Sequence, residues 1–425
     1  MANSLANHCD TGQSLISLDQ ALSELKSRVT PITVTEQVSL NDALGRVLAE
    51  DIVSSINVPP VDNSAMDGYA LRADDLTTAE NKQNQFDVSQ RICAGEVGEE
   101  LLPLTVARIF TGAPIPSGAD AVVMQENCEY DEVTKTVKIK QLPNSGSNVR
   151  KAGEDIKAGS VILKAGQKLR AQDIGLAASV GIANLNVNKR LKVAVFFTGD
   201  ELCDPENTPK AGQIYNSNRY TLSGLLKSLG CEVVDLGNVE DTLEATITAM
   251  QSAADQADLV MTSGGVSVGE EDHIRKALEH LGQLSMWRVN IKPGKPFAFG
   301  EINSMKQATP FIGLPGNPVS VFATFCIFAR PYILHTQGAS DTKAHSFKVS
   351  SGFALDGKES RNEYLRVRLE IDEQGQTSLA VYPNQSSGVL TSASWANGFA
   401  FIPANTAVKN GDLLEFTPFT EFSIA

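Results

Sequence analysis

Residues 258–265 read DLVMTSGG and residues 270–282 read EEDHIRKALEHLG: an apolar run, a glycine pair and then an amphipathic stretch. This order is typical of a buried strand that passes through a tight loop into a helix. It occurs three more times, in LKVAVFF (191–197) with SNRYTLSGLLKSLG (217–230), in CEVVDLG (231–237) with DTLEATITAM (241–250), and in PFIGLPGNP (310–318) with VSVFATFCIFARPYIL (319–334). Strands that alternate with helices predict a parallel sheet with right-handed crossovers, here a central α/β domain over residues 190–336.

The flanking segments have other patterns. Short strand-like runs separated by turn signals such as PIPSGA (114–119) predict a small β domain. Helical patterns lie before it, near 17–30 and 40–50, and after it, up to Gly181, so we expect this β domain to be inserted into a split one. The expected fold class is multidomain α/β: a split N-terminal α/β domain (15–52 and 150–189), an inserted β domain (53–149), the central parallel-sheet domain (190–336) and a C-terminal β barrel (341–425).

Composition limits the possible partners. The 425 residues are 42% hydrophobic and carry 36 Lys and Arg against 50 Asp and Glu, a net charge of −14. An acidic balance argues against nucleic acid or an anionic membrane as partner, because both need a basic surface. No apolar run reaches the roughly 18–20 residues of a membrane span, the N-terminus lacks the order of a signal peptide, and the six cysteines form no CxxC pair. We therefore expect a cytoplasmic protein with reduced thiols.

Polar clusters follow each strand of the central domain. They are TGDE (198–201), NVED (238–241), TSGGVSVG (262–269) and GLPGNP (313–318). In parallel sheets, ligands bind where loops leave the carboxyl ends of the strands. Four such loops at one edge of one sheet predict a single site there.

Several residues of these loops suit an anionic ligand. Gly264 and Gly265, before a helix, can present backbone amides to an anion, although a helix entry loop needs glycine for its own shape. The loop KPGKP places Lys292 and Lys295 in a stiff cationic segment, and Arg288 lies just before it. Solvated surface lysines explain the same pattern about equally well.

Two carboxylates near these loops suit a divalent ion. Asp241 begins DTLE, which also fits a capping box, and Asp272 opens a helical turn, where the helix dipole already favours a carboxylate. Beside a phosphate-binding loop, such carboxylates are typical ligands of Mg²⁺, which prefers oxygen donors and substrate phosphates.

Other enzyme classes are less well supported. GVSVG (265–269) matches the nucleophile elbow of serine hydrolases, with Ser267 as nucleophile. That motif needs its serine directly at the strand-to-helix turn, whereas the expected strand ends near Thr262 and no HGGG-type segment is present. Neither a P-loop nor a GxGxxG motif occurs, which argues against P-loop NTPases and Rossmann dehydrogenases.

Seven motifs together resemble those of the molybdopterin molybdenumtransferase family, called MoeA in bacteria and the E domain of gephyrin in eukaryotes. They run in the family's order along nearly the whole chain: DNSAMDGYA (62–70), RIFTGAPIP (108–116), GEDI (153–156), TGDEL (198–202), SGGVSVGEED (263–272), IKPGKPFAFG (291–300) and GLPGNPVS (313–320). The resemblance implies an enzyme that inserts molybdenum from molybdate into adenylylated molybdopterin, with release of AMP, in a Mg²⁺-dependent step. It also implies a homodimer of four-domain chains with the site in a cleft between subunits, and possible contact with the molybdopterin adenylyltransferase.

The resemblance also implies roles for individual residues. The catalytic group is Glu201, Asp67, Thr111 and Asp155; the substrate-binding group is Gly264, Gly265, Ser267, Lys292, Lys295, Arg288, Arg150, Pro315, Asn317 and Ser387; and the metal ligands are Asp241 and Asp272. Arg288 departs from the lysine that bacterial relatives carry there, and an arginine fork is not equivalent to a lysine point charge. For Glu201 we expect a role in orienting water or an oxo group.

Two rival interpretations share part of the pattern. A molybdopterin adenylyltransferase has the same kind of α/β domain, but it is a short single domain with TGGTG, whereas this chain has TSGGVSVG (262–269) and three further domains. A non-enzymatic scaffold of the gephyrin kind joins this module to an adenylyltransferase domain through a long linker, and neither is found in this sequence. Absence of pterin and AMP binding would favour the scaffold.

Overall fold

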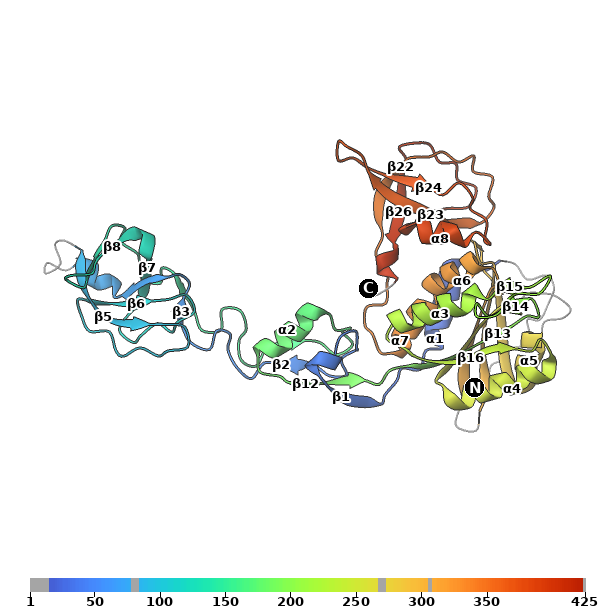
Figure 1. The fold of residues 1–425 in the computed structure, drawn as a ribbon, viewed down its shortest axis with the longest axis horizontal. Coiled ribbons are helices and arrows are strands. Elements are labelled where there is room, and N and C mark those ends of the chain that lie inside the picture. The colour runs from blue at the N-terminus through green and yellow to red at the C-terminus, as the bar shows by residue number, and fades with distance from the viewer. Residues whose placement is uncertain (1–14, 78–83, 267–272, 305–307, 423–425) are drawn as a thin grey trace, which may run out of the picture.

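The computed structural model describes residues 15–77, 84–266, 273–304 and 308–422. The molecule is elongated: a β domain lies at one end, a small α/β domain in the middle, and a large α/β domain with a β barrel beside it at the other end (Figure 1). The β domain at the far end is formed by one continuous segment of the chain. The middle one combines two segments, because the β domain is inserted into it.

The large domain is built on a six-stranded sheet in the order β16-β13-β17-β21-β20-β18. Its strands are β13 (Lys192–Thr198), β16 (Glu232–Val239), β17 (Leu259–Ser263), β18 (Gly282–Arg288), β20 (Pro296–Asn303) and β21 (Ala308–Leu314). The first four in spatial order are parallel, as predicted, and β20 and β18 extend the sheet in antiparallel fashion. A short parallel pair, β14 (Leu202–Cys203) and β15 (Ile214–Tyr215), follows β13.

Helices cover both faces of this sheet. Alternate residues of β13 face opposite ways: Val193 and Val195 belong to one buried cluster, Ala194 and Phe196 to the other. The first cluster includes side chains of α1 (Leu18–Ser27), α3 (Ser217–Ser228), α6 (Pro318–Thr324) and α7 (Arg330–Thr336). The second includes side chains of α4 (Leu243–Gln256) and α5 (His273–Leu281). The domain is thus a three-layer sandwich, and it includes α1, which had been expected in the split domain.

One continuous helical segment, Pro318–Thr336, combines α6, a π-helical stretch (Phe325–Ala329) and α7. Within the described residues it alone has the length and apolar composition of a membrane span, with a mean hydropathy of 1.3. However, 78% of it is buried inside the protein, as in the core helix of a soluble domain.

The middle domain consists of small antiparallel pairs and one helix. Its elements are β1 (Thr35–Ser39), β2 (Ile52–Val53), β11 (Val161–Leu163), α2 (Ala171–Ser179) and β12 (Asn184–Asn188), with β1 paired to β12 and β2 to β11. The helix expected over 40–50 is wrong. A single 3₁₀ turn (Leu40–Asp42) is followed by Gly45 at φ +73°, and Val47 and Leu48 then make β-bridges to the second segment. The apolar residues of this segment are therefore packed as in a strand and not as in a helix.

The inserted domain and the C-terminal domain are both β structures. The inserted sheet has the order β7-β4-β6-β5-β9-β8, from β4 (Gly68–Leu71), β5 (Gln85–Ile92), β6 (Thr105–Ile109), β7 (Ala121–Met124), β8 (Cys128–Asp131) and β9 (Thr136–Ile139). A neck pair, β3 (Asn63–Ser64) with β10 (Val149–Arg150), connects it to the middle domain.

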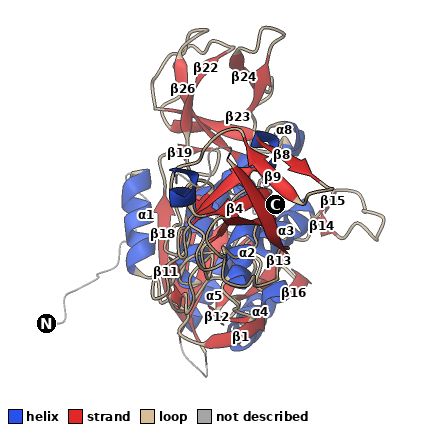
Figure 2. Ribbon diagram, turned by 90° about the vertical axis from the view of Figure 1, so that its left-hand side faces the viewer, coloured by secondary structure: helices blue, strands red, loops and turns tan. Residues whose placement is uncertain are grey.

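The C-terminal domain is a closed five-stranded barrel, as predicted. Its elements are β22 (Phe347–Ser351), β23 (Asn362–Ile371), β24 (Thr377–Val381), α8 (Leu390–Trp395), β25 (Gly398–Ile402) and β26 (Leu413–Pro418). β23 pairs with both β24 and β25, which closes the ring, and β19 (Ile291–Lys292) of the large domain adds to its edge. The barrel lies directly over the large domain (Figure 2).

Candidate active site

The loops at the carboxyl ends of β13, β16, β17 and β21 lie along one edge of the central sheet. The antiparallel strands add two cations to this edge. Ala298 pairs with Gly313, so the start of β20, with Lys295 just before it, lies beside the end of β21. Arg288 pairs with Pro296 and therefore lies at the same edge. The structure thus brings together four acidic or glycine-rich loops and two basic residues that are far apart in sequence.

The glycine pair forms a compact turn at the centre of this edge. Gly264 and Gly265 have φ values of +93° and +62°, which side chains rarely adopt. A Cβ on Gly265 would lie 2.6 Å from Cγ1 of Ile274, so the turn also needs glycine for packing. The Gly264 amide already donates to the carbonyl of Leu314, at 3.0 Å, and is not free for an anion. The Gly265 amide has no such backbone bond within the described part of the chain.

Asn218, in the first turn of α3, connects this turn with the PGNP loop. Its Nδ2 donates to the carbonyl of Gly316 at 2.7 Å, while its Oδ1 is buried without a hydrogen-bond partner in the described structure. A Cβ on Gly316 would lie 3.6 Å from Cα of Gly264, so the two loops are in contact. Ser263 Oγ is likewise buried and unpaired. Asn218 was not predicted from the sequence. The only feature that could have pointed to it is its amide side chain in the first turn of a helix at this sheet edge.

Glu201 is exposed at the end of the first strand. Its carbonyl accepts a hydrogen bond from Ile214 N at 2.7 Å, which fixes the backbone through the β14–β15 pair. Gly199 has φ +142°, and a Cβ there would lie 2.5 Å from Glu201 Oε2. The carboxylate therefore folds back over the strand end. Its side chain takes part in no salt bridge among the described residues.

Asp241 follows β16 and differs from its expected structural role. The N-cap of α4 is Thr242, whose hydroxyl accepts from Ala245 N at 3.3 Å, so the capping-box assignment of Asp241 is wrong. The Asp241 carboxylate, half-buried at the sheet edge, makes no hydrogen bond or salt bridge to the rest of the described chain. It is therefore available to a ligand.

The two lysines of the KPGKP loop are held differently. Lys292 Nζ lies 2.7 Å from Glu359 Oε2 and 3.0 Å from Glu363 Oε1, both on the C-terminal barrel. Lys295 has no salt bridge within the described residues. Sequence reasoning missed both glutamates, because they lie about seventy positions downstream, in another domain.

The barrel also reaches the PGNP loop. The carbonyl of Ser387 accepts a hydrogen bond from Val319 N, at 3.0 Å, in the first turn of α6, next to Asn317 and the Pro315 loop. Beneath this contact Arg366 is 1% exposed and donates to Ser386 O and Ser392 Oγ. Burial lowers the pKa of Arg366 to about 10, partly offset by Glu363. The guanidinium thus supports the loop that carries Ser387.

The predicted site residues of the inserted domain and neck form a separate group. Asp67 Oδ1 accepts bonds from both the backbone N and the hydroxyl of Thr111, each at 2.8 Å, and these bonds lower the pKa of Asp67. Arg150 and Asp155 are exposed in the neck. Within one chain this group lies far from the central edge, with the middle domain between them (Figure 1).

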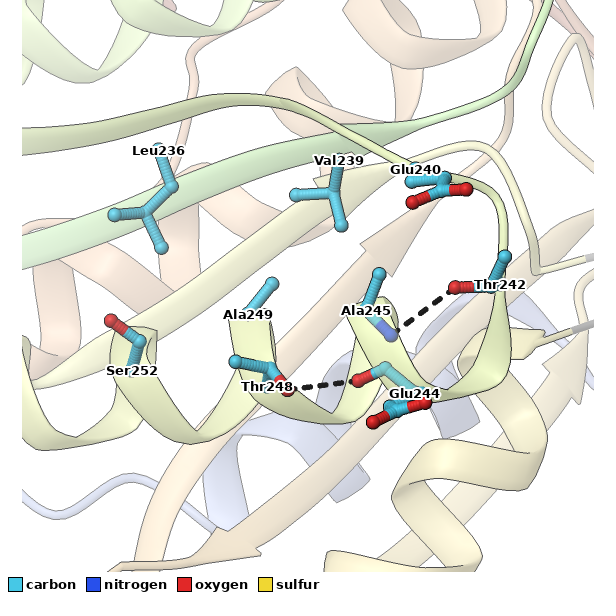
Figure 3. Close-up of a pocket in the computed structure, with 9 residues that line it drawn as sticks. All are labelled: Leu236, Val239, Glu240, Thr242, Glu244, Ala245, Thr248, Ala249 and Ser252. Atoms are coloured by element: carbon cyan, nitrogen blue, oxygen red, sulfur yellow. Dashed lines mark hydrogen bonds between the residues drawn. The ribbon is translucent and has the colours of Figure 1, made fainter.

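A cleft away from this edge has a different character. It has a volume of about 480 Å³ and lies between the outer side of β16, an edge strand, and α4 (Figure 3). Glu240 and Glu244 line it together with small and apolar side chains, and it contains no basic residue. Hydrogen bonds of Thr242 and Thr248 along its wall only stabilise the helix. A cleft of this charge repels anions, so we place the candidate site at the sheet edge.

Two predicted residues, Ser267 and Asp272, lie outside the described residues. β17 ends at Ser263, four positions before Ser267, which does not fit a nucleophile elbow. The described residues contain no cluster of three or more acidic, cysteine or histidine side chains able to hold a metal ion. The donor set at the edge, with Asp241 unpaired, fits an ion that takes most of its oxygens from phosphate and water, as Mg²⁺ commonly does.

Comparison with known proteins shows which family has this architecture. Family models for the MoeA N-terminal region (domain I and II), a probable molybdopterin binding domain and the MoeA C-terminal region (domain IV) match residues 16–181, 194–335 and 348–419. The molybdopterin molybdenumtransferase of Haemophilus influenzae is 40% identical over 95% of this chain and 99% of its own. Molybdopterin molybdenumtransferase 2 of Mycobacterium tuberculosis is 35% identical over 90% and 94%.

Solved structures agree with the sequence relatives. The MoeA protein of Pyrococcus horikoshii superposes with a TM-score of 0.81 at 29% identity, covering 95% of this chain and 100% of that one. A second structure of the P. horikoshii protein gives 0.75 at 31% identity, with 96% and 99% covered. The match extends over all four domains and their order. The chain therefore belongs to the MoeA family of molybdopterin molybdenumtransferases.

Proposed function

We propose that this transferase of molybdenum cofactor biosynthesis inserts molybdenum from molybdate into adenylylated molybdopterin and releases AMP. The observation that carries the proposal is the central sheet edge, along which Asp241, Glu201, the glycine turn, Lys295 and Arg288 follow one another from β16 to β18, with both carboxylates unpaired among the described residues. Molybdate is a dianion and the pterin adenylate carries further negative charge. Basic side chains and a backbone amide at a strand edge supply the hydrogen bonds that such ligands need.

We expect the residues of the edge to have different functions in the reaction. Lys295, Arg288 and the Gly265 amide hold the anionic groups, and Asn317 and Ser387 border the same loops. Glu201 orients the attacking oxygen with its carboxylate, which lies close to Gly199 at the strand end. Asp241, with Asp272, would hold Mg²⁺, which neutralises negative charge on the cleaved anhydride when it is bound.

A second copy of the chain would complete the site. The inserted domain, with Asp67 and Thr111, and the neck, with Arg150 and Asp155, are separated from the large domain of their own chain by the middle domain (Figure 1). A two-fold dimer places the same surface of each chain against the other. We propose that the inserted domain of one subunit lies against the central edge of its partner, so that each dimer has two shared sites.

The activity can be tested directly with purified protein, adenylylated molybdopterin and Mg²⁺. AMP release and reconstitution of an apo-molybdoenzyme are followed with and without low concentrations of molybdate. Molybdate-dependent appearance of both products supports the transferase. Tight pterin binding without turnover would favour a carrier or scaffold, and absence of binding would contradict the proposed function.

A further inference from the structure

The KPGKP loop connects the central sheet with the C-terminal barrel. Its first residue, Lys292, belongs to β19, which pairs in parallel with β23: Ile291 lies opposite Asn362 and Lys292 opposite Glu363. The Arg361 guanidinium also donates to Ile291 O at 3.3 Å. The loop is therefore part of the barrel edge as well as of the sheet edge, and its position depends on both domains.

Lys292 is the charged centre of this connection. Its ammonium contacts Glu359 and Glu363, whose side chains are only 24% and 15% exposed. Burial opposes the charge of Lys292, but its bonds to the two carboxylates outweigh burial and raise its pKa. Burial likewise disfavours the ionised form of Glu359, yet the bond with Lys292 lowers the pKa of this carboxyl. Lys292 and Glu359 are therefore both charged at neutral pH, and Arg361, whose Nε lies 3.3 Å from Glu359 Oε1, adds a second cation to the cluster.

The other lysine of the loop lies in a different environment. Lys295 has no salt bridge within the described residues and lies at the sheet edge beside the end of β21. Between the two lysines, Gly294 has φ +103°, and a Cβ there would lie 2.3 Å from Thr324 Cγ2 of α6. The turn is thus packed tightly against α6 on one side and fixed to the barrel on the other. A shift of either contact would move Lys295.

We propose that Glu359 and Glu363 are positioning residues that hold Lys292 in a latch between the barrel and the central domain, so that Lys295 alone of the two KPGKP lysines binds the substrate anion. This inference rests on the proposed function. An anion that bound Lys292 would have to approach two carboxylates within about 3 Å of the ammonium, and like charges at that range repel strongly. Removing the carboxylates would leave a partly buried cation unpaired, which is costly.

The test compares five variants with the wild-type dimer. Binding of inorganic molybdate is measured by calorimetry, and turnover by AMP release. Lys295→Gln is expected to weaken molybdate binding about tenfold, the loss of one charge-assisted contact. Lys292→Met and the double variant Glu359→Gln/Glu363→Gln are each expected to lower kcat/KM about tenfold, and their combination to be no worse than the stronger of them, because all remove one latch. Lys292→Arg keeps the charge and is expected to restore turnover.

The matched control is Lys358→Gln. Lys358 and its partner Asp356 line the same cleft, of about 290 Å³, as Lys292, but their pair is exposed (84% and 65%). Its removal is expected to leave binding and turnover unchanged. If Lys292 instead binds the anion, Glu359→Gln/Glu363→Gln will tighten molybdate binding and Lys292→Met will weaken it as much as Lys295→Gln does. Either result would overturn the latch.

A measurement that does not depend on enzymatic turnover tests this inference separately from the proposed function. Hydrogen exchange at the amides of β19 and of the start of β23 is expected to increase in Lys292→Met and in the double acid variant, and to stay unchanged in Lys358→Gln. Unchanged exchange in the latch variants would overturn the proposal even if the enzyme is active. If the wild type releases no AMP, the proposed function fails, while the exchange data still decide on the latch.

Discussion

The central edge and the inserted domain both carry family motifs, but they hold their charged groups in different ways. In the inserted domain, one carboxylate oxygen of Asp67 accepts two hydrogen bonds from Thr111, and the motif stabilises its own loop. At the central edge, Glu201, Asp241 and Lys295 have no partner of their own among the described residues. Groups that are already paired shape a surface, whereas unpaired groups remain free to bind ligand. On this comparison we propose that the chemistry belongs to the central edge and that the inserted domain shapes the cleft.

The strongest test of this division is Glu201→Gln. The change keeps the size and polarity of the side chain but removes the negative charge, so substrate should still bind. We expect kcat to fall by about 10²–10⁴-fold, the usual contribution of a catalytic carboxylate. AMP release measured at saturating substrate checks this, with Glu206→Gln, an exposed glutamate of the following loop, as control. Wild-type turnover in Glu201→Gln would remove the central edge from the chemistry.

A smaller effect is expected at Asp67, and its pattern sharpens the comparison. Asp67→Asn keeps an oxygen that can accept from Thr111, so we expect less than about a threefold loss of turnover. Asp67→Ala leaves the Thr111 amide and hydroxyl without their acceptor, and we expect a loss of about 10–100-fold through displacement of the loop. Because Thr111 lowers the pKa of Asp67, activity should not titrate with this group near neutral pH. Equal losses in both variants would show that the charge itself acts in the reaction.

Glycine substitutions compare the packing of the two regions. Gly294→Ala combines a positive φ with a clash against Thr324, and we expect the free energy of unfolding to fall by about 2–4 kcal/mol. Gly112, in the inserted domain, also has a positive φ (+85°), but a Cβ there would meet nothing within 4 Å. Gly112→Ala should cost only about 1 kcal/mol. Denaturant unfolding measures both, and equal costs would contradict tight packing of the KPGKP turn.

The smallest expected effect concerns the junction of the middle and large domains. Lys168 donates to Leu229 O at 3.0 Å, and burial lowers its pKa from 10.5 to about 8. The unfolded chain therefore binds more protons between these values, and the wild type should gain roughly 1–3 kcal/mol of stability as pH rises from 8 to 10.5. Lys168→Met should lack this gain. Parallel pH–stability curves for the two proteins would show that Lys168 is not buried at this junction.

Much of the fold was predictable because its signals are local. The apolar strands and the glycine turn at 264–265 define the parallel sheet, and the alternating pattern of the tail defines the barrel. The wrong helix at 40–50 had a helical apolar spacing, but Gly45 and the bridges of Leu48 to the second segment determine its structure. Such long-range pairing has no signature in a single short window.

The candidate site was predictable only as a set of residue types. The sequence places Lys292 and Lys295 three positions apart and so treats them alike. Their difference arises from Glu359 and Glu363, which a separate domain brings to one of them. The capping role predicted for Asp241 was also wrong, by one position. Helix α4 begins at Leu243, so its N-cap is Thr242. Pairing of this kind depends on tertiary structure, which residue spacing does not encode.

The central claim, that two chains share each site, is tested most directly by a mixed dimer. Chains carrying Glu201→Gln and chains carrying Asp67→Ala are co-expressed with different tags, and the heterodimer is isolated by tandem purification. If each site combines the central edge of one chain with the inserted domain of the other, one site of the heterodimer carries both changes and the other neither. Its turnover should then be about half that of the wild type. Turnover no higher than the mean of the two single variants would show that each site is built within one chain, and would contradict the account.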